Sequence, residues 1–231
     1  MLYFMLNLLK DHFNSRFFSI LGPAYSESDY VPLDLSHQAT SEMALDLSTE
    51  FALQDYLEIY LKERQAKAAF GGYLEKRSLY DRSSYFGDSS HSHKRNIHLG
   101  LDVWAPAETP VYSPLAGKIH SQQDNLNYGD YGPTIILEHE LKGGKFYTLY
   151  GHLSRESLYS YKVGEEILLN QPLALLGTNE VNGNYAPHLH FQLIMDLGDK
   201  AGDYPGVSSE TDLEFYKNNC PDPNLLLNFK S

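Results

Sequence analysis

The feature that most constrains the fold is a series of short apolar runs between Ile97 and Leu193, separated by Gly, Pro and Asn. Examples are "PTIILEHE", "KFYTLYGHLS" and "PHLHFQLIMD". Apolar runs of strand length, spaced by turn residues, are typical of a sandwich or barrel. The 18 Tyr and 11 Phe of the chain also favour strands. The sequence therefore predicts a mainly β fold, an antiparallel β sandwich or barrel.

A helical pattern precedes these runs. Within residues 1–22 apolar positions recur at near-helical spacing. From about Ser48, "STEFALQDYLEIYLKERQAKAAFGG" predicts an amphipathic helix that Gly71 and Gly72 end. Because an isolated helix gains little stability without packing, we expect its apolar stripe to dock on the β domain. The stripe consists of Leu53, Tyr56, Leu57, Tyr60 and Leu61.

These patterns divide the chain into three expected parts. Residues 1–75 form an N-terminal helical segment that packs on the core, and residues 76–200 form the β domain. Residues 201–231 are polar and punctuated by Pro and Asn, which predicts an irregular C-terminal tail.

Composition excludes several classes of protein. The formal net charge of −12 is unsuited to nucleic acid, since phosphate contacts need Lys and Arg. The one cysteine, Cys220, rules out an intrachain disulfide and a Cys-based zinc finger. No apolar run reaches the roughly 18 residues of a transmembrane helix. The first positive charge, Lys10, follows the N-terminal apolar run, unlike in a secretory signal, so we expect a cytoplasmic protein.

Two closely spaced pairs of polar residues point to chemistry. His98 and Asp102 are four residues apart, and His188 and His190 are two apart. Since side chains alternate along a strand, an even spacing places both members of a pair on one face. Gly100, between the first two, is expected to leave open space for a metal and a substrate.

Imidazoles and a carboxylate together suit Zn²⁺. A catalytic zinc site uses three protein ligands and keeps one position for water, so one of His188 and His190 would be spare for proton transfer. His152, at the end of "KFYTLYGHLS", is a further candidate. By contrast, His91 and His93 lie in a Ser-rich stretch and are expected to be solvated.

The segments "HLGLD", "YGHLS" and "PHLHF", in this order and with the strands between them, resemble the lysostaphin-type (LytM-like) zinc metallopeptidases over about residues 95–196. The resemblance implies the fold of that family, the duplicated hybrid motif. It implies His98, Asp102 and His190 as ligands of one Zn²⁺ per chain, and His152 and His188 as the catalytic histidines. It also implies endopeptidase activity on a peptide substrate of the peptidoglycan or glycine-rich type.

The chain departs from the family in the turn before "HLH", where "GTNEVNGNYA" is longer and bulkier than the usual Gly/Ser-rich turn. The flanks "FGGYLEKRSLYDRSSYF" and "CPDPNLLL" resemble segments around the peptidase-like middle domain of fusion proteins. Those fusion proteins carry a phosphotransferase-like domain before it and a class III aminotransferase after it. This similarity leaves open a substrate other than cell-wall peptide.

Two rival functions remain. A non-catalytic binding module could keep the β scaffold, although all five implied positions are intact. A carrier-type domain would instead need a lysine at a hairpin tip, or a phosphorylatable histidine pair without the aspartate. A measurement of bound metal distinguishes the metallopeptidase from both rival functions. Relatives can be latent through an N-terminal segment that reaches the metal, and Asp29, Asp34 and His37 are candidates for that contact.

Overall fold

The computed structural model describes residues 16–45, 50–83, 86, 94–142 and 144–230. Most of the helix expected within residues 1–22 lies outside this part of the chain, as do His91 and His93. Residues 16–22 form no helix, and a turn occupies Ile20 and Leu21.

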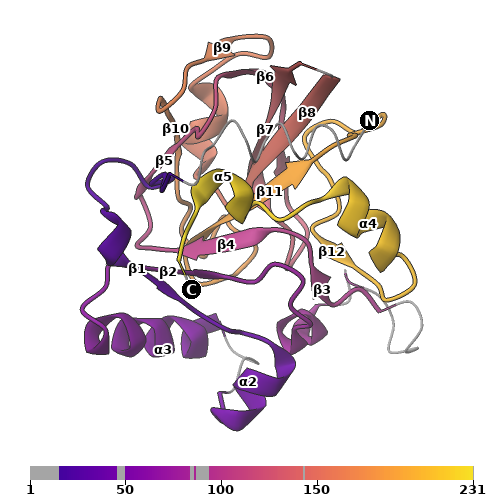
Figure 1. Ribbon diagram of the computed structural model, residues 1–231. Helices are drawn as coiled ribbons and strands as arrows, with labels where there is room; N and C mark the ends of the chain where they lie inside the picture. The colour runs from indigo at the N-terminus through magenta and orange to yellow at the C-terminus, as the bar shows by residue number, and fades with distance from the viewer. Residues whose placement is uncertain (1–15, 46–49, 84–85, 87–93, 143, 231) are drawn as a thin grey trace.

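An eight-stranded sheet forms the centre of the molecule (Figure 1). Strands β1 and β2 pair in parallel, and the other neighbouring pairs are antiparallel. The prediction of a mainly β fold is confirmed, with a large mixed sheet as its core. In spatial order the strands are β1 Tyr30–Pro32, β2 Ala68–Gly71, β4 Leu101–Trp104, β11 His188–Ile194, β8 Gly144–Gly151, β7 Gly132–Leu141, β6 Gly117–Asn125 and β9 Glu166–Ile167.

Smaller elements complete the fold around this sheet. Two further antiparallel pairs are β5 Pro110–Tyr112 with β10 Pro172–Leu175, and β3 Ile97–His98 with β12 Val207–Ser208. The α-helices are α2 His37–Glu42, α3 Glu50–Glu63, α4 Leu213–Asn219 and α5 Asn224–Leu227. Single 3₁₀ turns are η1 Glu27–Asp29, η2 Ser78–Arg82 and η4 Arg155–Tyr159.

Strand β11 separates the apolar core from the polar face of the sheet. All seven of its residues are buried. Leu189, Phe191 and Leu193 belong to the main apolar cluster, together with residues of β4, β7 and β8. Because side chains alternate, His188, His190 and Gln192 project from the opposite face. The core thus holds the histidine-bearing strand rigidly from behind.

The predicted helix is shorter than its sequence pattern suggests. It ends at Glu63, and Gln65 follows with a positive φ of 52°. Ala68–Gly71 then forms β2, which pairs with both β1 and β4. The expected end at Gly71 and Gly72 is wrong, because hydrogen bonds to two distant strands outweigh the helix propensity of the alanines.

The apolar face of α3 lies against the β structure, beside β1 and β2 in Figure 1. Leu53 and Leu57 are buried in a cluster that also contains Trp104 of β4 and Tyr185. Tyr56, Tyr60 and Leu61 pack partly buried against the same cluster. The α3 side chains therefore reach strand β4, which carries Asp102.

The C-terminal residues are more ordered than a polar tail suggests. Instead of an irregular stretch, residues 201–231 contain β12, α4 and α5 (Figure 1). Cys220, Leu226 and Leu227 are at most 1% exposed. The apolar "NLLL" turn and the cysteine pack against the sheet, which offsets the polar composition around them.

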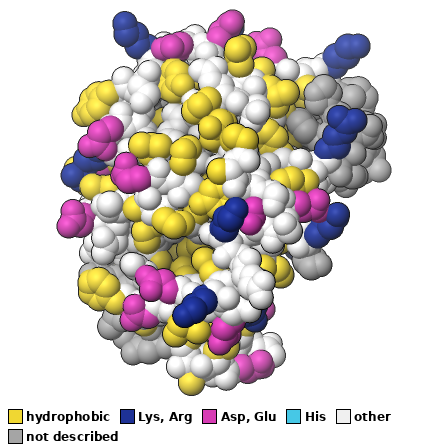
Figure 2. All heavy atoms as spheres, turned by 90° about the vertical axis from the view of Figure 1, so that its left-hand side faces the viewer, with side chains coloured by type: hydrophobic (Ala, Val, Ile, Leu, Met, Phe, Trp, Pro, Cys, Tyr) yellow, Lys and Arg dark blue, Asp and Glu magenta, His cyan; other side chains and the backbone are white. Residues whose placement is uncertain are grey.

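The surface is mixed in character. On the face shown in Figure 2, acidic and basic side chains are interspersed among apolar ones, without a continuous patch of either charge. Among the described residues, no helix combines the length and apolarity needed to cross a membrane.

We predict that Leu57→Ala lowers the free energy of unfolding by about 2 to 4 kcal/mol, since it leaves a cavity between α3 and β4. The matched control is Ile59→Ala on the same helix, where the side chain is 61% exposed. The control is expected to change stability by at most about 0.5 kcal/mol. Urea denaturation followed by circular dichroism measures both, and equal losses would contradict the docking of this face.

Candidate metal centre

Strand register brings the site together. His190 of β11 lies directly opposite Asp102 of β4 and, on its other side, opposite Gly151 of β8. His152 follows Gly151 immediately. Two antiparallel pairings therefore place Asp102, His152 and His190 at one level of the sheet.

His98 reaches the same place by another route than expected. The alternation argument assumed one continuous strand from His98 to Asp102. The chain is instead interrupted at Leu99 and Gly100, so that β3 pairs with β12 while β4 pairs with β2 and β11. The two side chains still meet, with His98 Nε2 at 3.2 Å from Asp102 Oδ1.

Three ligand atoms form a compact triangle. His98 Nε2 lies 2.9 Å from His190 Nδ1, and His190 Nδ1 lies 3.2 Å from Asp102 Oδ1. All three residues are 2% exposed. Two ligands of a tetrahedral metal with bonds near 2.0–2.1 Å are about 3.3 Å apart, so the triangle has close to the required size.

The protons of these side chains point away from the triangle. His98 Nδ1 donates to Gly72 O at 2.9 Å, and His190 Nε2 donates to Gln192 Oε1 at 2.9 Å. The two nitrogens that face each other are then bare lone pairs. Asp102 Oδ1 has no hydrogen-bond partner among the described residues. Three acceptors that converge without a proton repel one another, and a cation between them removes this cost.

The electrostatics keep His98 and Asp102 in their ligating forms. Burial raises the pKa of Asp102, but the neighbouring His98 and Arg77 hold it well below its ordinary value, so the carboxylate is ionised. Burial lowers the pKa of His98 to about 4, against the opposing effect of Asp102. A neutral imidazole and a carboxylate near pH 7 are the states that bind a divalent metal.

His152 and His188 stand beside the triangle with a common orientation. His152 Nδ1 donates to Asn182 O and His188 Nδ1 donates to Ala186 O, both at 2.7 Å. Their ring centroids are 4.2 Å apart, and His188 Nε2 is 3.9 Å from Asp102 Oδ1. Burial lowers the pKa of both, that of His152 well below its ordinary value. Each ring therefore keeps an unprotonated Nε2.

The backbone of His152 is strained. Its φ is +60°, an unusual value for a residue with a side chain. Two hydrogen bonds hold it, from His152 N to Tyr131 O at 2.8 Å and from Gly177 N to His152 O at 2.9 Å. Strain of this kind persists where the surroundings fix the backbone, and here it turns the ring out of the β8 ladder toward His188.

The long turn before β11 orients both of these histidines. It supplies the carbonyls of Asn182 and Ala186. Asn182 closes the turn on itself, as its Oδ1 accepts from Tyr185 N at 3.0 Å and its Nδ2 donates to Tyr185 O at 3.1 Å. The bulky "GTNEVNGNYA" segment is thus a support for the side chains rather than a flexible connection.

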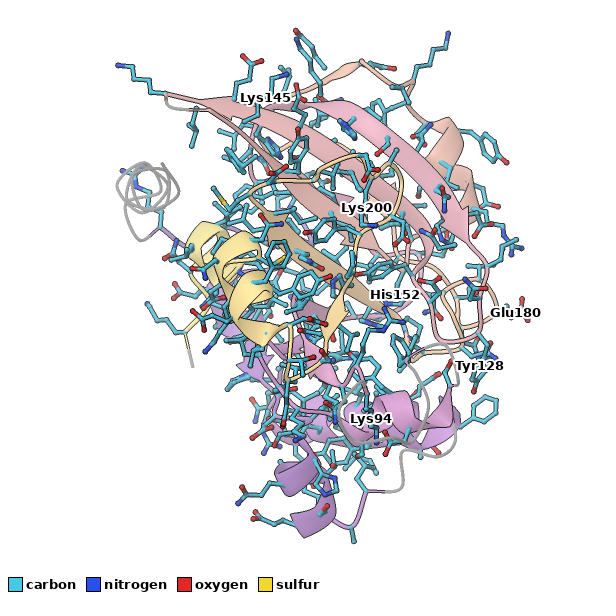
Figure 3. The ribbon with its side chains drawn as sticks, turned by 90° about the vertical axis from the view of Figure 1, so that its right-hand side faces the viewer. Lys94, Tyr128, Lys145, His152, Glu180 and Lys200 are labelled. Atoms are coloured by element: carbon cyan, nitrogen blue, oxygen red, sulfur yellow. The ribbon has the colours of Figure 1, made fainter. Side chains whose placement is uncertain are left out.

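A cavity of about 240 Å³ opens at the cluster. Its walls come from three parts of the chain: Leu79 and Tyr80 of η2, the histidines of the cluster, and Tyr204 and Val207 near β12. Figure 3 shows His152 in this region, with Lys200 on one side and Lys94 on the other. Lys200 also lines the cavity. Apolar and aromatic walls with a few convergent polar groups are typical of a binding site.

Two residues of the site, Gln192 and Arg77, have no part in the sequence argument, and a third, Gly100, has another role than the sequence suggested. Gln192, the acceptor for His190, follows the "HLH" motif by the same period of two, so alternation could have identified it. Arg77 hydrogen-bonds to Asp102, and no sequence motif around Arg77 indicates this contact. Gly100 has a different role from the one expected: a Cβ there would lie 2.5 Å from His190 Cε1. The glycine makes room for a ligand ring rather than for substrate.

The candidates for a latency contact lie elsewhere. Asp29 accepts a hydrogen bond from Ser26 N and pairs with Lys67, and Asp34 accepts from Ser36 N. Neither of these, nor His37 at the start of α2, lines the cavity. The idea that one of them reaches the metal is wrong for this conformation.

Comparison with known proteins points to one family. The model of peptidase family M23 matches residues 96–201. Similar solved structures include the catalytic domain of the antimicrobial peptidase lysostaphin from Staphylococcus simulans, with 27% identity over 53% of this chain and 80% of that chain and a TM-score of 0.37. No curated protein matches the sequence.

Two further structures are similar over part of the chain. A putative peptidase M23 from Pseudomonas aeruginosa is 24% identical over 58% of this chain and 45% of that chain, with a TM-score of 0.39. A zinc containing peptidase from Vibrio cholerae is 26% identical over 48% and 31%, with a TM-score of 0.37. This chain spans less than half the length of either. The family match supports peptidase family M23 for residues 96–201.

We predict that Gly100→Ala displaces the His190 ring, lowers the free energy of unfolding by about 1 to 3 kcal/mol and reduces bound metal. The control is Gly164→Ala, which strains a backbone with φ +86° but meets nothing within 4 Å. The control is expected to lose some stability and keep its metal. Elemental analysis and urea denaturation measure the two effects, and full metal in Gly100→Ala would contradict the steric role.

Proposed function

We propose that this chain is a zinc-dependent endopeptidase. The observation behind the proposal is the buried triangle of His98 Nε2, His190 Nδ1 and Asp102 Oδ1, whose atoms lie 2.9 to 3.2 Å apart. Two imidazoles and one carboxylate are the donor set of catalytic zinc sites. The match to peptidase family M23 over residues 96–201 supports a peptidase, and therefore a hydrolase.

The triangle would hold the metal from one side. Zinc supplies Lewis acidity there, lowering the pKa of a bound water to about 7 and polarising the substrate carbonyl. With two neutral imidazoles and one carboxylate, the site keeps a net positive charge of about one. His98, Asp102 and His190 would hold the metal at the wall of the cavity, which is where the peptide would enter.

His152 and His188 would move the protons. Each has its Nδ1 hydrogen fixed on a backbone carbonyl and a bare Nε2, so each can accept a proton from water or, once protonated, stabilise the oxyanion. Burial keeps both neutral near pH 7, as a base requires. Proton transfer by such a group contributes about 10²- to 10⁴-fold in rate.

We propose a peptide as substrate, of the peptidoglycan or glycine-rich type. The cavity beside the triangle, lined by aromatic and polar side chains, offers a place for such a peptide. The cytoplasmic location expected from the N-terminal sequence stays a prediction.

We predict about one equivalent of zinc in protein purified without added metal, measured by elemental analysis. His98→Ala is expected to lose it, because two ligands bind zinc far more weakly than three. His120→Ala is the control: this histidine bonds Ser121 Oγ and contacts Tyr147, apart from the triangle. A His98→Ala protein with full zinc would refute the ligand assignment, and wild-type protein without zinc would favour a non-catalytic module or carrier.

We also predict that His152→Ala and His188→Ala keep their zinc but lose about 10²- to 10⁴-fold in peptide hydrolysis. The assay uses a panel of glycine-rich peptides and peptides containing D-amino acids, with His120→Ala again as control. Wild-type activity in either variant would remove that histidine from the proposed chemistry. Zinc-loaded wild-type protein that cleaves no member of the panel would count against the proposed substrate class.

A further inference from the structure

The most unusual group near the triangle is a fully buried arginine. Arg77 is 2% exposed and precedes η2, outside the region that matches the peptidase family. Its Nη1 donates to Asp102 Oδ2 at 2.5 Å, and its Nε donates to Glu75 Oε2 at 2.8 Å. A buried guanidinium is costly unless its charge is compensated, so its contact with the carboxylate of a candidate ligand needs an explanation.

The contact divides the two oxygens of Asp102 between two tasks. Arg77 occupies Oδ2, while Oδ1 faces His98 and His190 without a hydrogen bond. A carboxylate can bind a metal through one oxygen or through both. With Oδ2 engaged by a charged donor, only Oδ1 is free to bind.

We propose that Arg77 is a positioning residue that makes Asp102 a one-oxygen ligand and so keeps a coordination position open for water. This inference rests on the zinc site proposed above. Without Arg77, Oδ2 could turn toward the metal as a fifth ligand and crowd the position that water needs.

The surrounding backbone is arranged to hold the arginine. Arg77 N donates to Asn96 O, and His98 N donates to Glu75 O, both at 2.9 Å. The chain before η2 is thereby tied to the strand that carries His98. Glu75 then fixes the guanidinium at its other end.

Gly72 provides both space and a hydrogen-bond acceptor. A Cβ at this position would overlap Arg77 Nη2 and lie 2.9 Å from His98 Nδ1. The Gly72 carbonyl accepts the hydrogen bond from His98 Nδ1. One short segment, residues 72–77, thus orients His98 and Asp102, two of the three proposed ligands, without itself binding the metal.

The charges of this group also favour a cation in the triangle. Arg77 contributes +1, and Glu75 and Asp102, both buried or nearly so, contribute −1 each when ionised. The group is therefore deficient in positive charge, and a divalent ion supplies it. These charges also guide the choice of variant. Replacing Arg77 and Glu75 together by uncharged residues leaves the net charge of the group unchanged, so that only the contact with Asp102 is lost.

The test compares the wild-type protein with the double variant Arg77→Met/Glu75→Gln and the single variant Arg77→Lys. Cobalt(II) replaces zinc, because the intensity of its visible absorption bands distinguishes four-coordinate from five-coordinate sites. Competition with a chelator measures zinc affinity. The control pair is Arg155→Met/Asp124→Asn, which removes an exposed Arg–Asp contact of 2.9 Å away from the triangle.

We expect the cobalt bands of the double variant to weaken toward a five-coordinate spectrum and its zinc affinity to fall about 10- to 100-fold. Arg77→Lys, which keeps the charge but not the geometry of the two-ended contact, should lie between it and wild type. The control pair should match wild type. A wild-type cobalt spectrum in the double variant overturns the proposal, whatever its zinc affinity.

If the double variant does not fold, the cobalt spectrum of Arg77→Lys decides instead: a shifted spectrum supports the positioning role and an unshifted one overturns it. Failure of the proposed function has a different signature. Wild-type protein that binds neither zinc nor cobalt removes the metal site itself, whereas metal-loaded wild type with insensitive variants removes only the role of Arg77.

Discussion

The burial of Asp102 is the constraint on which the rest of the site depends. Its carboxylate is 2% exposed at the centre of the sheet, where an uncompensated charge would cost several kcal/mol. Arg77 compensates one oxygen directly. The other oxygen faces two imidazole lone pairs, an arrangement that is unfavourable alone and favourable around a cation. Burial of this charge between two histidines is therefore what makes the cluster a candidate cation site.

The groups that orient the ligands come from well separated parts of the chain. Residues 72–77 orient His98 and Asp102. His190 depends on Gln192, whose Nε2 donates to Pro205 O at 3.1 Å and contacts Cys220 Sγ at 3.2 Å. The N-terminal and C-terminal segments thus complete the coordination geometry that the β strands begin. Partners of this kind fix the tautomer and the direction of a ligand ring, which explains why the site needs more chain than its motifs occupy.

The orientation of the two candidate catalytic histidines depends on the turn before β11 and on the backbone of His152. A closed, asparagine-bonded turn presents the carbonyls of Asn182 and Ala186, and a strained backbone at His152 brings its ring to 4.2 Å from that of His188. Tyr185 of this turn lines the cavity, while Asn182 O and Ala186 O of the same turn accept the hydrogen bonds of the two rings. One turn therefore both shapes the cavity wall and orients the two rings.

The sequence by itself determined what depends on local periodicity. Alternation along "HLH" places His188 and His190 on one face, and spaced apolar runs predict a mainly β fold, because side chains alternate along a strand wherever it lies. Only the tertiary structure decided the contacts made across the chain. Ala68–Gly71 forms a strand because it hydrogen-bonds to β1 and β4. Gly100 leaves room for the ring of His190, 90 residues later in the chain. Arg77 hydrogen-bonds to Asp102, 25 residues away. Each of these contacts joins residues that are far apart in the sequence. The free energy of burying a charge depends on the partner beside it, and a local sequence pattern does not identify that partner.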